Sequence, residues 1–145
     1  MNPNCIFCRI VAGQAPASIV YEDEATLAFM DAMPVTRGHT LVIPKQHVEN
    51  AYGLTAEEAA ALMRTAVKIA RAARSSLGCV GVNFWMANER PSGQTVMHAH
   101  MHIIPRYPGD GFGLRRWAEG VRPERDNLDD VAAAIRAHLD TDAGG

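Results

Sequence analysis

Three histidines separated by single residues restrict what their segment of the chain can form. His98, His100 and His102 lie in the stretch MHAHMHIIPR, residues 97–106. A helix would spread this spacing around its axis, whereas a strand places alternate side chains on one face. The residues between the histidines are apolar and would form the opposite face. We therefore predict a strand with an imidazole face, ended by Pro105, which has no N–H for a ladder hydrogen bond.

The same spacing limits the chemistry of the three rings. Because four residues of strand span roughly 13 Å, His98 and His102 cannot both bind one zinc ion at about 2.0–2.1 Å. A zinc centre made of all three histidines is not expected, although an adjacent pair can share a metal. The alternative is catalysis, because imidazoles titrate near neutrality. One ring can then attack an electrophile while others manage protons and phosphate charge.

Several short motifs accompany the histidines in a fixed order. The row is preceded by GQTV at 93–96 and followed by Pro105-Arg106. The other blocks, spread over residues 5–106, are Cys5-Ile6-Phe7-Cys8, Tyr21-Glu22-Asp23, Leu27–Asp31, Gly38–Lys45 and Asn88. Together these motifs resemble the histidine triad (HIT) family of nucleotidyl hydrolases and transferases. The resemblance implies an α+β, HIT-like fold, with an antiparallel sheet of about five strands, one long helix and a C-terminal helix.

Length and composition limit the chain to one folded unit. A chain of 145 residues, 48% of them apolar, can build one real core but not two. We expect one HIT domain over residues 1–140, with its core at 5–106, an extension at 107–140 and a disordered tail at 141–145. No apolar run spans a membrane and no signal-peptide pattern is present, so a cytoplasmic location is expected. The net charge of -2 predicts neither nucleic-acid nor membrane binding.

Local sequence patterns predict where the helices and strands lie. A capping box at 55–58 predicts the start of a long helix. An apolar stripe that includes Met63 continues to Leu77, and Gly78 is expected to end the helix. A short turn of helix is predicted at 10–13 and a final helix at 126–139. Besides the histidine segment, strands are predicted at 18–21, 26–31, 39–44 and 80–87.

Cys5 and Cys8 form a C-x-x-C motif that favours zinc over redox chemistry. A thioredoxin-like redox pair requires a preceding strand, which the four residues before Cys5 cannot supply. His47 and His98 would complete a Cys2His2 set, and the zinc-bearing branch of the HIT family uses the matching residues. We therefore predict one structural zinc ion. The alternative is a metal-free cluster with hydrogen-bonded histidines.

The resemblance assigns catalysis to the remaining histidines. It makes His100 the nucleophile toward the α-phosphorus of a nucleotide, a role that suits an imidazole that is neutral at pH 7. His102 and His39 are the candidates to orient His100, bind phosphate oxygens and pass a proton to the leaving group. The expected substrate is a purine nucleoside monophosphate conjugate, such as a phosphoramidate, hydrolysed through a nucleotidyl-histidine intermediate.

Nucleotide contacts are predicted on both sides of the triad. Phe29 and Asp31 fall on one strand face, where the carboxylate can hold ribose hydroxyls under a stacked base; alternatively Asp31 is a solvated strand end. Gln94 and Thr95 precede the triad and can meet a phosphate, or they can serve the turn after Gly93. The resemblance supports a nucleotide-binding set of Phe7, Phe29, Asp31, Asn88, Gln94, Thr95, His100 and His102.

Some questions stay open at the level of sequence. The purine-binding branch commonly has isoleucines where this chain has Ala15 and Ala32, so there is room for looser base contacts or a larger base. Other possible functions are a dinucleoside polyphosphate hydrolase or phosphorylase, a nucleotide-binding regulator with residual turnover, and a zinc-dependent structural module. The resemblance implies a homodimer with the joint near 80–87. The loop at 109–117 has no assigned role, although 114–117 can fold back on the site or on a partner subunit.

Overall fold

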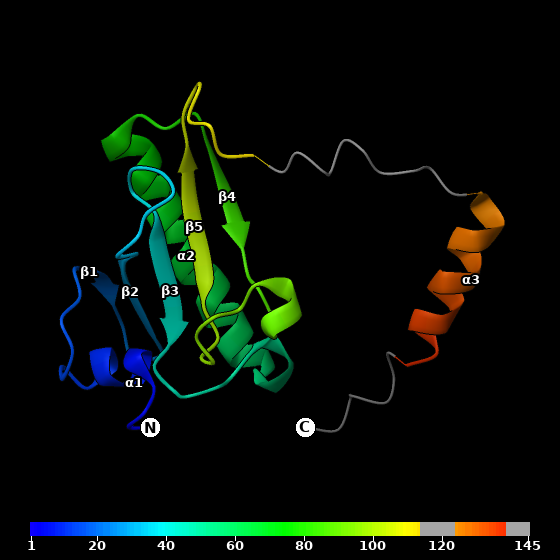
Figure 1. Cartoon of the computed structure of the whole chain (residues 1–145), viewed down its shortest axis with the longest axis horizontal. Coiled ribbons are helices and arrows are strands. Elements are labelled where there is room, and N and C mark those ends of the chain that lie inside the picture. The colour runs from blue at the N-terminus through cyan, green and yellow to red at the C-terminus, as the bar shows by residue number, and fades with distance from the viewer. Residues whose placement is uncertain (114–123, 139–145) are drawn as a thin grey trace. The chain divides into compact units, whose positions relative to one another are not determined.

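An antiparallel sheet of five strands forms the frame of the protein (Figure 1). We describe it from a computed structural model that covers residues 1–113 and 124–138. The strand order is β1-β2-β3-β5-β4, and the consecutive strands β1 and β2 pair antiparallel as a hairpin. The strands are β1 (Ile19–Glu22), β2 (Thr26–Met30), β3 (Thr40–Pro44), β4 (Gly81–Trp85) and β5 (Met101–Arg106).

The histidine segment departs from the predicted strand. Strand β5 begins at Met101, so His98 and His100 precede it. Strand β3 continues to Pro44, but its pairing with β5 extends only to Val42, opposite Met101. Ahead of β5 the amide of Ala99 donates instead to the carbonyl of Val48, in the loop after β3, at 2.7 Å.

Pro105 also differs from its prediction, because it lies inside β5 and does not end it. Its carbonyl accepts from Thr36 Oγ1 at 2.6 Å, on the side where the β3 ladder has already ended at Ile103. A missing N–H on that side therefore costs no ladder hydrogen bond.

Helix α2 (Ala56–Leu77) covers one face of the sheet (Figure 1). The predicted capping box is present: Thr55 Oγ1 accepts from the amide of Glu58 at 3.2 Å, and the Glu58 carboxylate accepts from the amide of Thr55 at 2.9 Å. Gly78 ends the helix with φ of 68°. Met63 is a correction, because its side chain is exposed. The buried stripe instead includes Thr65, whose hydroxyl bonds that of Thr26 at 2.8 Å.

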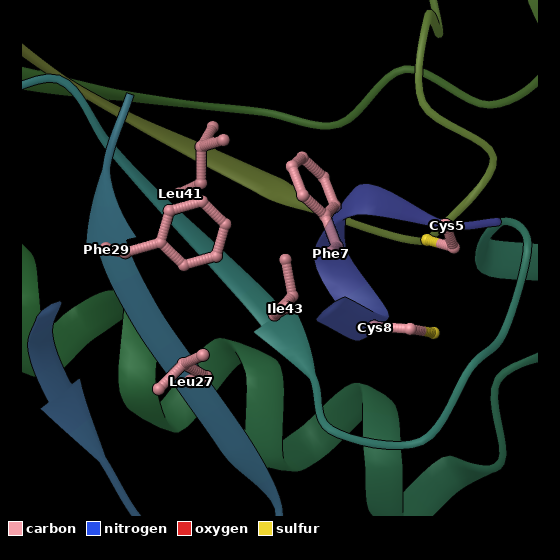
Figure 2. Packing of buried hydrophobic residues seen from close by; sticks show 7 residues of the cluster. All are labelled: Cys5, Phe7, Cys8, Leu27, Phe29, Leu41 and Ile43. Carbon is pink, nitrogen blue, oxygen red and sulfur yellow. The ribbon is translucent and has the colours of Figure 1, made fainter. Parts of the chain in front are cut away.

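Helix α1 (Ile6–Val11) packs on the opposite face of the sheet (Figure 2). It starts earlier than the helical turn predicted at 10–13, and its Phe7 and Cys8 are buried. Because side chains alternate along a strand, β2 and β3 present one set of residues to α2 and another to α1. The α1 side consists of Leu27, Phe29, Leu41 and Ile43, and the α2 side includes Ala28 and Val42.

The chain divides into two units, residues 1–112 and 113–145, and each is considered by itself. In the second unit, α3 (Arg125–Arg136) matches the helix predicted at 126–139 in its described part. The predictions for 114–117 and 141–145 lie outside the described residues. The single domain over 1–140 stays a prediction. Within the described ranges, no helix has the length and apolar character needed to cross a membrane.

Candidate active site

The predicted zinc ligands converge beside the first turn of α1. Cys5 and Cys8 come from that helix end, His47 follows β3, and His98 precedes β5. Their ligand atoms all lie within 4.8 Å of one another. Sulfur-to-Nδ1 distances are 3.5 Å for Cys5–His98, 3.2 Å for Cys8–His47 and 3.7 Å for Cys8–His98. A tetrahedral zinc ion with ordinary bond lengths holds its ligand atoms about 3.3–3.8 Å apart, so the cluster fits zinc.

A carbonyl behind the cluster fixes the orientation of His98. Its Nε2 lies 2.8 Å from the carbonyl oxygen of Pro44. Because a carbonyl only accepts, Nε2 carries the proton and Nδ1 directs its lone pair toward the sulfurs. Burial lowers the pKa of His98, which favours the neutral ring that a metal requires.

The middle histidine has one nitrogen occupied and one free. Nδ1 of His100 donates to the carbonyl of His98 at 2.6 Å, which leaves a lone pair on Nε2. In the described part of the chain, no buried side-chain nitrogen or oxygen lacks a partner. Nε2 of His100 has no hydrogen bond, so it must be reached by solvent through the adjoining cavity. Burial lowers the pKa of His100 and keeps this nitrogen unprotonated.

A short chain of hydrogen bonds orients His102. The amide of Val35 donates to Nδ1 of His39 at 3.2 Å, so the His39 proton lies on Nε2. That Nε2 is 2.8 Å from Nδ1 of His102, which must accept and therefore carries its own proton on Nε2. Burial, together with the neighbouring His100 and His39 rings, lowers the pKa of His102 to about 4. A neutral ring with its N–H on Nε2 results.

Asp31 completes this group, with its carboxylate 3.5 Å from His39 Nε2 and 3.9 Å from His102 Nδ1. These three residues also place their ligand atoms within 4.8 Å of one another. A metal would, however, need the lone pair of His39 Nε2, and the Val35 amide keeps the proton there. We therefore interpret the group as a hydrogen-bonded relay with a nearby carboxylate.

His39, His100 and His102 form one wall of a cavity of about 860 Å³ on the α1 face of the sheet. Phe7 packs edge-to-face on Phe29, with ring centroids 5.4 Å apart, and on His100, with centroids 5.3 Å apart. The carboxylate of Asp31 lies at the same cavity. An aromatic floor, a carboxylate and an unprotonated imidazole thus meet in one hollow, which suits a base, a ribose and a phosphate.

Comparisons with known proteins agree with this geometry. The family model of the HIT domain matches residues 12–109. The chain belongs to the HIT family. Protein hit of Bacillus subtilis (strain 168) is 48% identical over 139 residues, covering 94% of this chain and 94% of that protein. This confirms the resemblance found in the sequence.

Solved HIT structures support the fold. SMU.412c from Streptococcus mutans UA159 matches with a TM-score of 0.88 and 45% identity, covering 96% of this chain and 87% of that one. A Zn-bound histidine triad family protein from Mycobacterium smegmatis matches with a TM-score of 0.74 and 39% identity, covering 95% and 96%. The α+β HIT fold, with its five-stranded sheet, long helix and C-terminal helix, is confirmed.

Some predicted nucleotide contacts of this HIT protein serve the loop instead of lining the cavity. Gln94 is buried: its Oε1 accepts from the Glu89 amide at 2.7 Å, and its Nε2 donates to the carbonyls of Glu49 and Val96 at 2.6 and 3.0 Å. Asn88 Oδ1 accepts from the amide of Ala51 at 2.7 Å. Only Thr95 of this group lines the cavity. Nucleotide contacts by Gln94 and Asn88 stay predictions.

The sequence interpretation missed part of the cavity wall. Ile6 and Ile10, one helical turn apart on α1, line the hollow with Phe7. Their i, i+4 spacing beside the cysteine motif was the available signal. Ala32 also lines the cavity, whereas Ala15 is not among the lining residues. Helix α1 therefore supplies two isoleucines to the cavity wall.

Proposed function

We propose that this HIT protein is a nucleotide-binding hydrolase that cleaves nucleoside phosphoramidates or related nucleotide conjugates at the α-phosphorus. The observation that carries the proposal is the hydrogen bond from Nδ1 of His100 to the carbonyl of His98. It fixes the tautomer and leaves a nucleophilic Nε2 at a large cavity. Family membership supports the same chemistry.

The reaction runs in two displacements. Nε2 of His100 attacks phosphorus, the bond to the leaving nitrogen breaks, and that nitrogen takes the proton from Nε2 of His102. Water then breaks the bond between phosphorus and His100; its hydroxyl ends on phosphorus and its proton restores that of His102. The phosphate anion of the bound substrate raises the pKa of His102, so the ring takes up a second proton from solvent when the substrate binds. It returns to its neutral form when it passes one proton to the leaving nitrogen.

The remaining cavity residues hold the nucleoside. Asp31 is positioned to accept hydrogen bonds from ribose hydroxyls, because its carboxylate lies beside His39 and His102 at the cavity wall. The edge-to-face pair of Phe7 and Phe29 offers an apolar surface for the base. Thr95 also lines the cavity and is the hydroxyl residue closest in sequence to His100.

The Cys2His2 cluster is proposed to hold one structural zinc ion through Cys5, Cys8, His47 and His98. Four protein ligands would complete a tetrahedral shell, so a bound ion would have no open position for substrate or water. Its role is to join α1 to the strand-entry segment that carries His100. The relative from Mycobacterium smegmatis, described as Zn-bound, supports this assignment.

Trapping the intermediate tests the proposal. The protein is mixed with an adenosine phosphoramidate, quenched in acid-free denaturant and digested, and the peptides are analysed by mass spectrometry. A nucleotidyl adduct on the peptide containing His100, absent in His100→Asn, is the expected result. The same experiment with a diadenosine polyphosphate separates the two candidate substrate classes. Turnover without any adduct would contradict covalent catalysis by His100.

A further inference from the structure

The cavity beside the catalytic histidines extends across most of the sheet. Its wall includes His102 on β5, Leu41 on β3 and Phe29 on β2, and it continues to Ser18, which directly precedes β1. In the sheet, β5 and β1 are three strand positions apart, with β3 and β2 between them. Because neighbouring strands lie about 4.8 Å apart, the cavity spans roughly 14 Å from the histidines to its other end.

The end of the cavity remote from the histidines has no part in the proposed reaction, and we name it the far end. Helix α1 forms one side of it, and the segment between α1 and β1 forms the other. The described residues that line the far end are Ile6, Ile10, Pro16, Ala17 and Ser18.

The two isoleucines of α1 present apolar surface to the far end. Ile6 and Ile10 are one helical turn apart, so their side chains lie on the same side of α1. Ile10 packs partly against the core cluster that contains Phe7 and Phe29, whereas Ile6 remains 42% exposed. An exposed isoleucine at the edge of a concavity is removed from water when an apolar ligand covers it.

The far end carries no charged side chain. Among the described residues that line it, the hydroxyl of Ser18 is the single polar side-chain group. The titratable groups of the cavity wall lie together at the other end, and they are Asp31, His39, His100 and His102. A charged or strongly hydrated group would lose its water at the far end without gaining a partner. The far end therefore suits an apolar group.

The proposed position of the nucleotide directs the base toward the far end. The phosphorus lies at Nε2 of His100, and the ribose hydroxyls lie at Asp31. The base then packs against Phe7 and Phe29, on the way from the histidines to the far end (Figure 2). In a purine nucleoside the ribose is joined to the five-membered ring, so the six-membered ring points away from the ribose. A substituent on the six-membered ring would thus enter the far end.

We propose that the far end binds an apolar substituent on the purine base, so that the protein prefers nucleotides of N6-alkylated adenine. This inference rests on the proposed function and specifies the substrate class within it. The substituent and the exposed surface of Ile6 leave water together on binding, and this burial supplies the preference. The chemistry at the α-phosphorus is the same for substituted and unsubstituted bases, because the substituent lies at the opposite end of the cavity from His100.

Three nucleotides without a cleavable leaving group test the proposal by calorimetric titration of the natural protein. They are AMP, N6-butyl-AMP and N6-(2-methoxyethyl)-AMP, and the two substituents have equal numbers of non-hydrogen atoms but differ in polarity. We expect the Kd of N6-butyl-AMP to be at least about 10-fold lower than that of AMP, and at least about 3-fold lower than that of the methoxyethyl compound. Equal Kd values in either comparison, or no binding of any of the three, would overturn the proposal.

Two variants assign the preference to the far end. Ile6→Gln makes one wall polar at similar size, and Ala17→Met fills the cavity from the segment before β1. In each variant the ratio of the AMP and N6-butyl-AMP Kd values should fall to about 3-fold or less, while AMP affinity and zinc content stay close to those of the natural protein.

Matched controls carry the same substitutions outside the cavity. Ile135→Gln changes an exposed isoleucine of α3, and Ala12→Met changes the residue that caps the end of α1; neither residue lines the cavity. Both controls should keep the ratio of the natural protein. An unchanged ratio in both Ile6→Gln and Ala17→Met would show that the substituent binds elsewhere, and the proposal would be wrong.

Hydrolysis measurements separate this proposal from the proposed function. Adenosine 5'-phosphoramidate and its N6-butyl analogue are compared in the natural protein and in His100→Asn. If N6-butyl-AMP binds more tightly than AMP but neither phosphoramidate is hydrolysed, the hydrolase assignment fails and the far-end proposal stands. If both are hydrolysed through His100 but AMP and N6-butyl-AMP bind with equal Kd, the far-end proposal fails and the hydrolase assignment stands.

Discussion

The buried imidazoles predict an unusual pH dependence at the scale of single residues. Burial lowers the pKa of His100, and the pKa of His102 falls to about 4. Protonation of His100 Nε2 would remove the attacking lone pair, so activity decreases as pH falls through that pKa. We expect the acid limb of kcat/KM for a phosphoramidate to lie below about 6.5, the ordinary histidine value. An acid limb at or above that value, measured between pH 4 and 9, would contradict the lowered pKa.

Replacing the nucleophile should separate chemistry from folding. His100→Asn removes the attacking nitrogen but keeps a polar side chain of similar size, so the protein should fold and bind nucleotide. Loss of covalent catalysis should lower the rate by at least about 10³-fold, or about 4 kcal/mol in activation free energy. His98→Asn is the comparison, because it removes a zinc ligand and should reduce stability and metal content first. A folded His100→Asn protein with more than about a tenth of normal turnover would exclude His100 as the nucleophile.

Sequence spacing could predict which residues gather at the site but not which atoms are free. The resemblance to the HIT family indicated His98 as a metal ligand and His100 as the nucleophile, and the cysteine motif indicated partners of His98. The tautomers depend on the carbonyls of Pro44 and His98 and on the amide of Val35. These backbone groups are placed by turns whose geometry the side-chain pattern does not encode. For the same reason the sequence pattern did not show that Gln94 bonds the loop backbone, and its contact with a phosphate stays a prediction.

At the scale of elements, the turn before β3 approaches the end of α2 closely at Gly38. Gly38 has φ of 88°, and an added Cβ would collide with Leu77 Cδ1 and lie 3.2 Å from Pro105 Cγ. Gly78 has a similar φ of 68° but nothing within 4 Å of an added Cβ. Gly78→Ala should therefore cost only the left-handed strain, about 1–2 kcal/mol, and Gly38→Ala should cost more.

Thermal unfolding of the two glycine variants measures the difference. Each kcal/mol should lower Tm by about 2–4 °C in a chain of this length. Gly38→Ala should therefore have the lower Tm of the two. Equal melting temperatures would mean that Leu77 moves aside without cost and that the close approach at Gly38 does not stabilise the fold.

Elements with local signals were predicted best. The long helix was predicted from its capping box to its glycine stop, because both ends are set by residues close in sequence. The histidine strand was predicted too long, because its start depends on where its pairing with β3 begins, and β3 is far away in the chain. Ile6 and Ile10 were missed as cavity residues for a related reason: only the tertiary fold brings α1 over the site.

At the scale of the whole molecule, the cysteine cluster connects the N-terminus to the sheet. Cys5→Ser should release zinc and lower Tm by several degrees, because the binding energy of a structural metal contributes to folding. Cys79→Ser, which alters a buried cysteine outside the cluster, should keep its zinc. Mass spectrometry measures the zinc content of both variants, and calorimetry measures their Tm. Equal zinc content in the two variants would contradict the proposed ligand set.

The free edge of β4 predicts a homodimer, in which the sheet continues into a second copy of the chain. In the described part of the chain β4 pairs only with β5, so its other edge offers unpaired backbone groups. Phe84 within β4 is 40% exposed, and Val80, just before the strand, is 71% exposed. An apolar edge strand of this kind is stable in water when another strand covers it.

Charges placed at the two sheet edges distinguish where the copies meet. Phe84→Glu brings a desolvated charge to the proposed joint and should shift the protein to monomer in analytical ultracentrifugation at micromolar concentration. Ile19→Glu places the same charge on β1, at the opposite edge, where Ile19 is 50% exposed, and should leave the dimer intact. If Ile19→Glu alone yields monomer, the joint lies on β1. If the natural protein is already a monomer under these conditions, the edge of β4 must be protected by something other than a second copy.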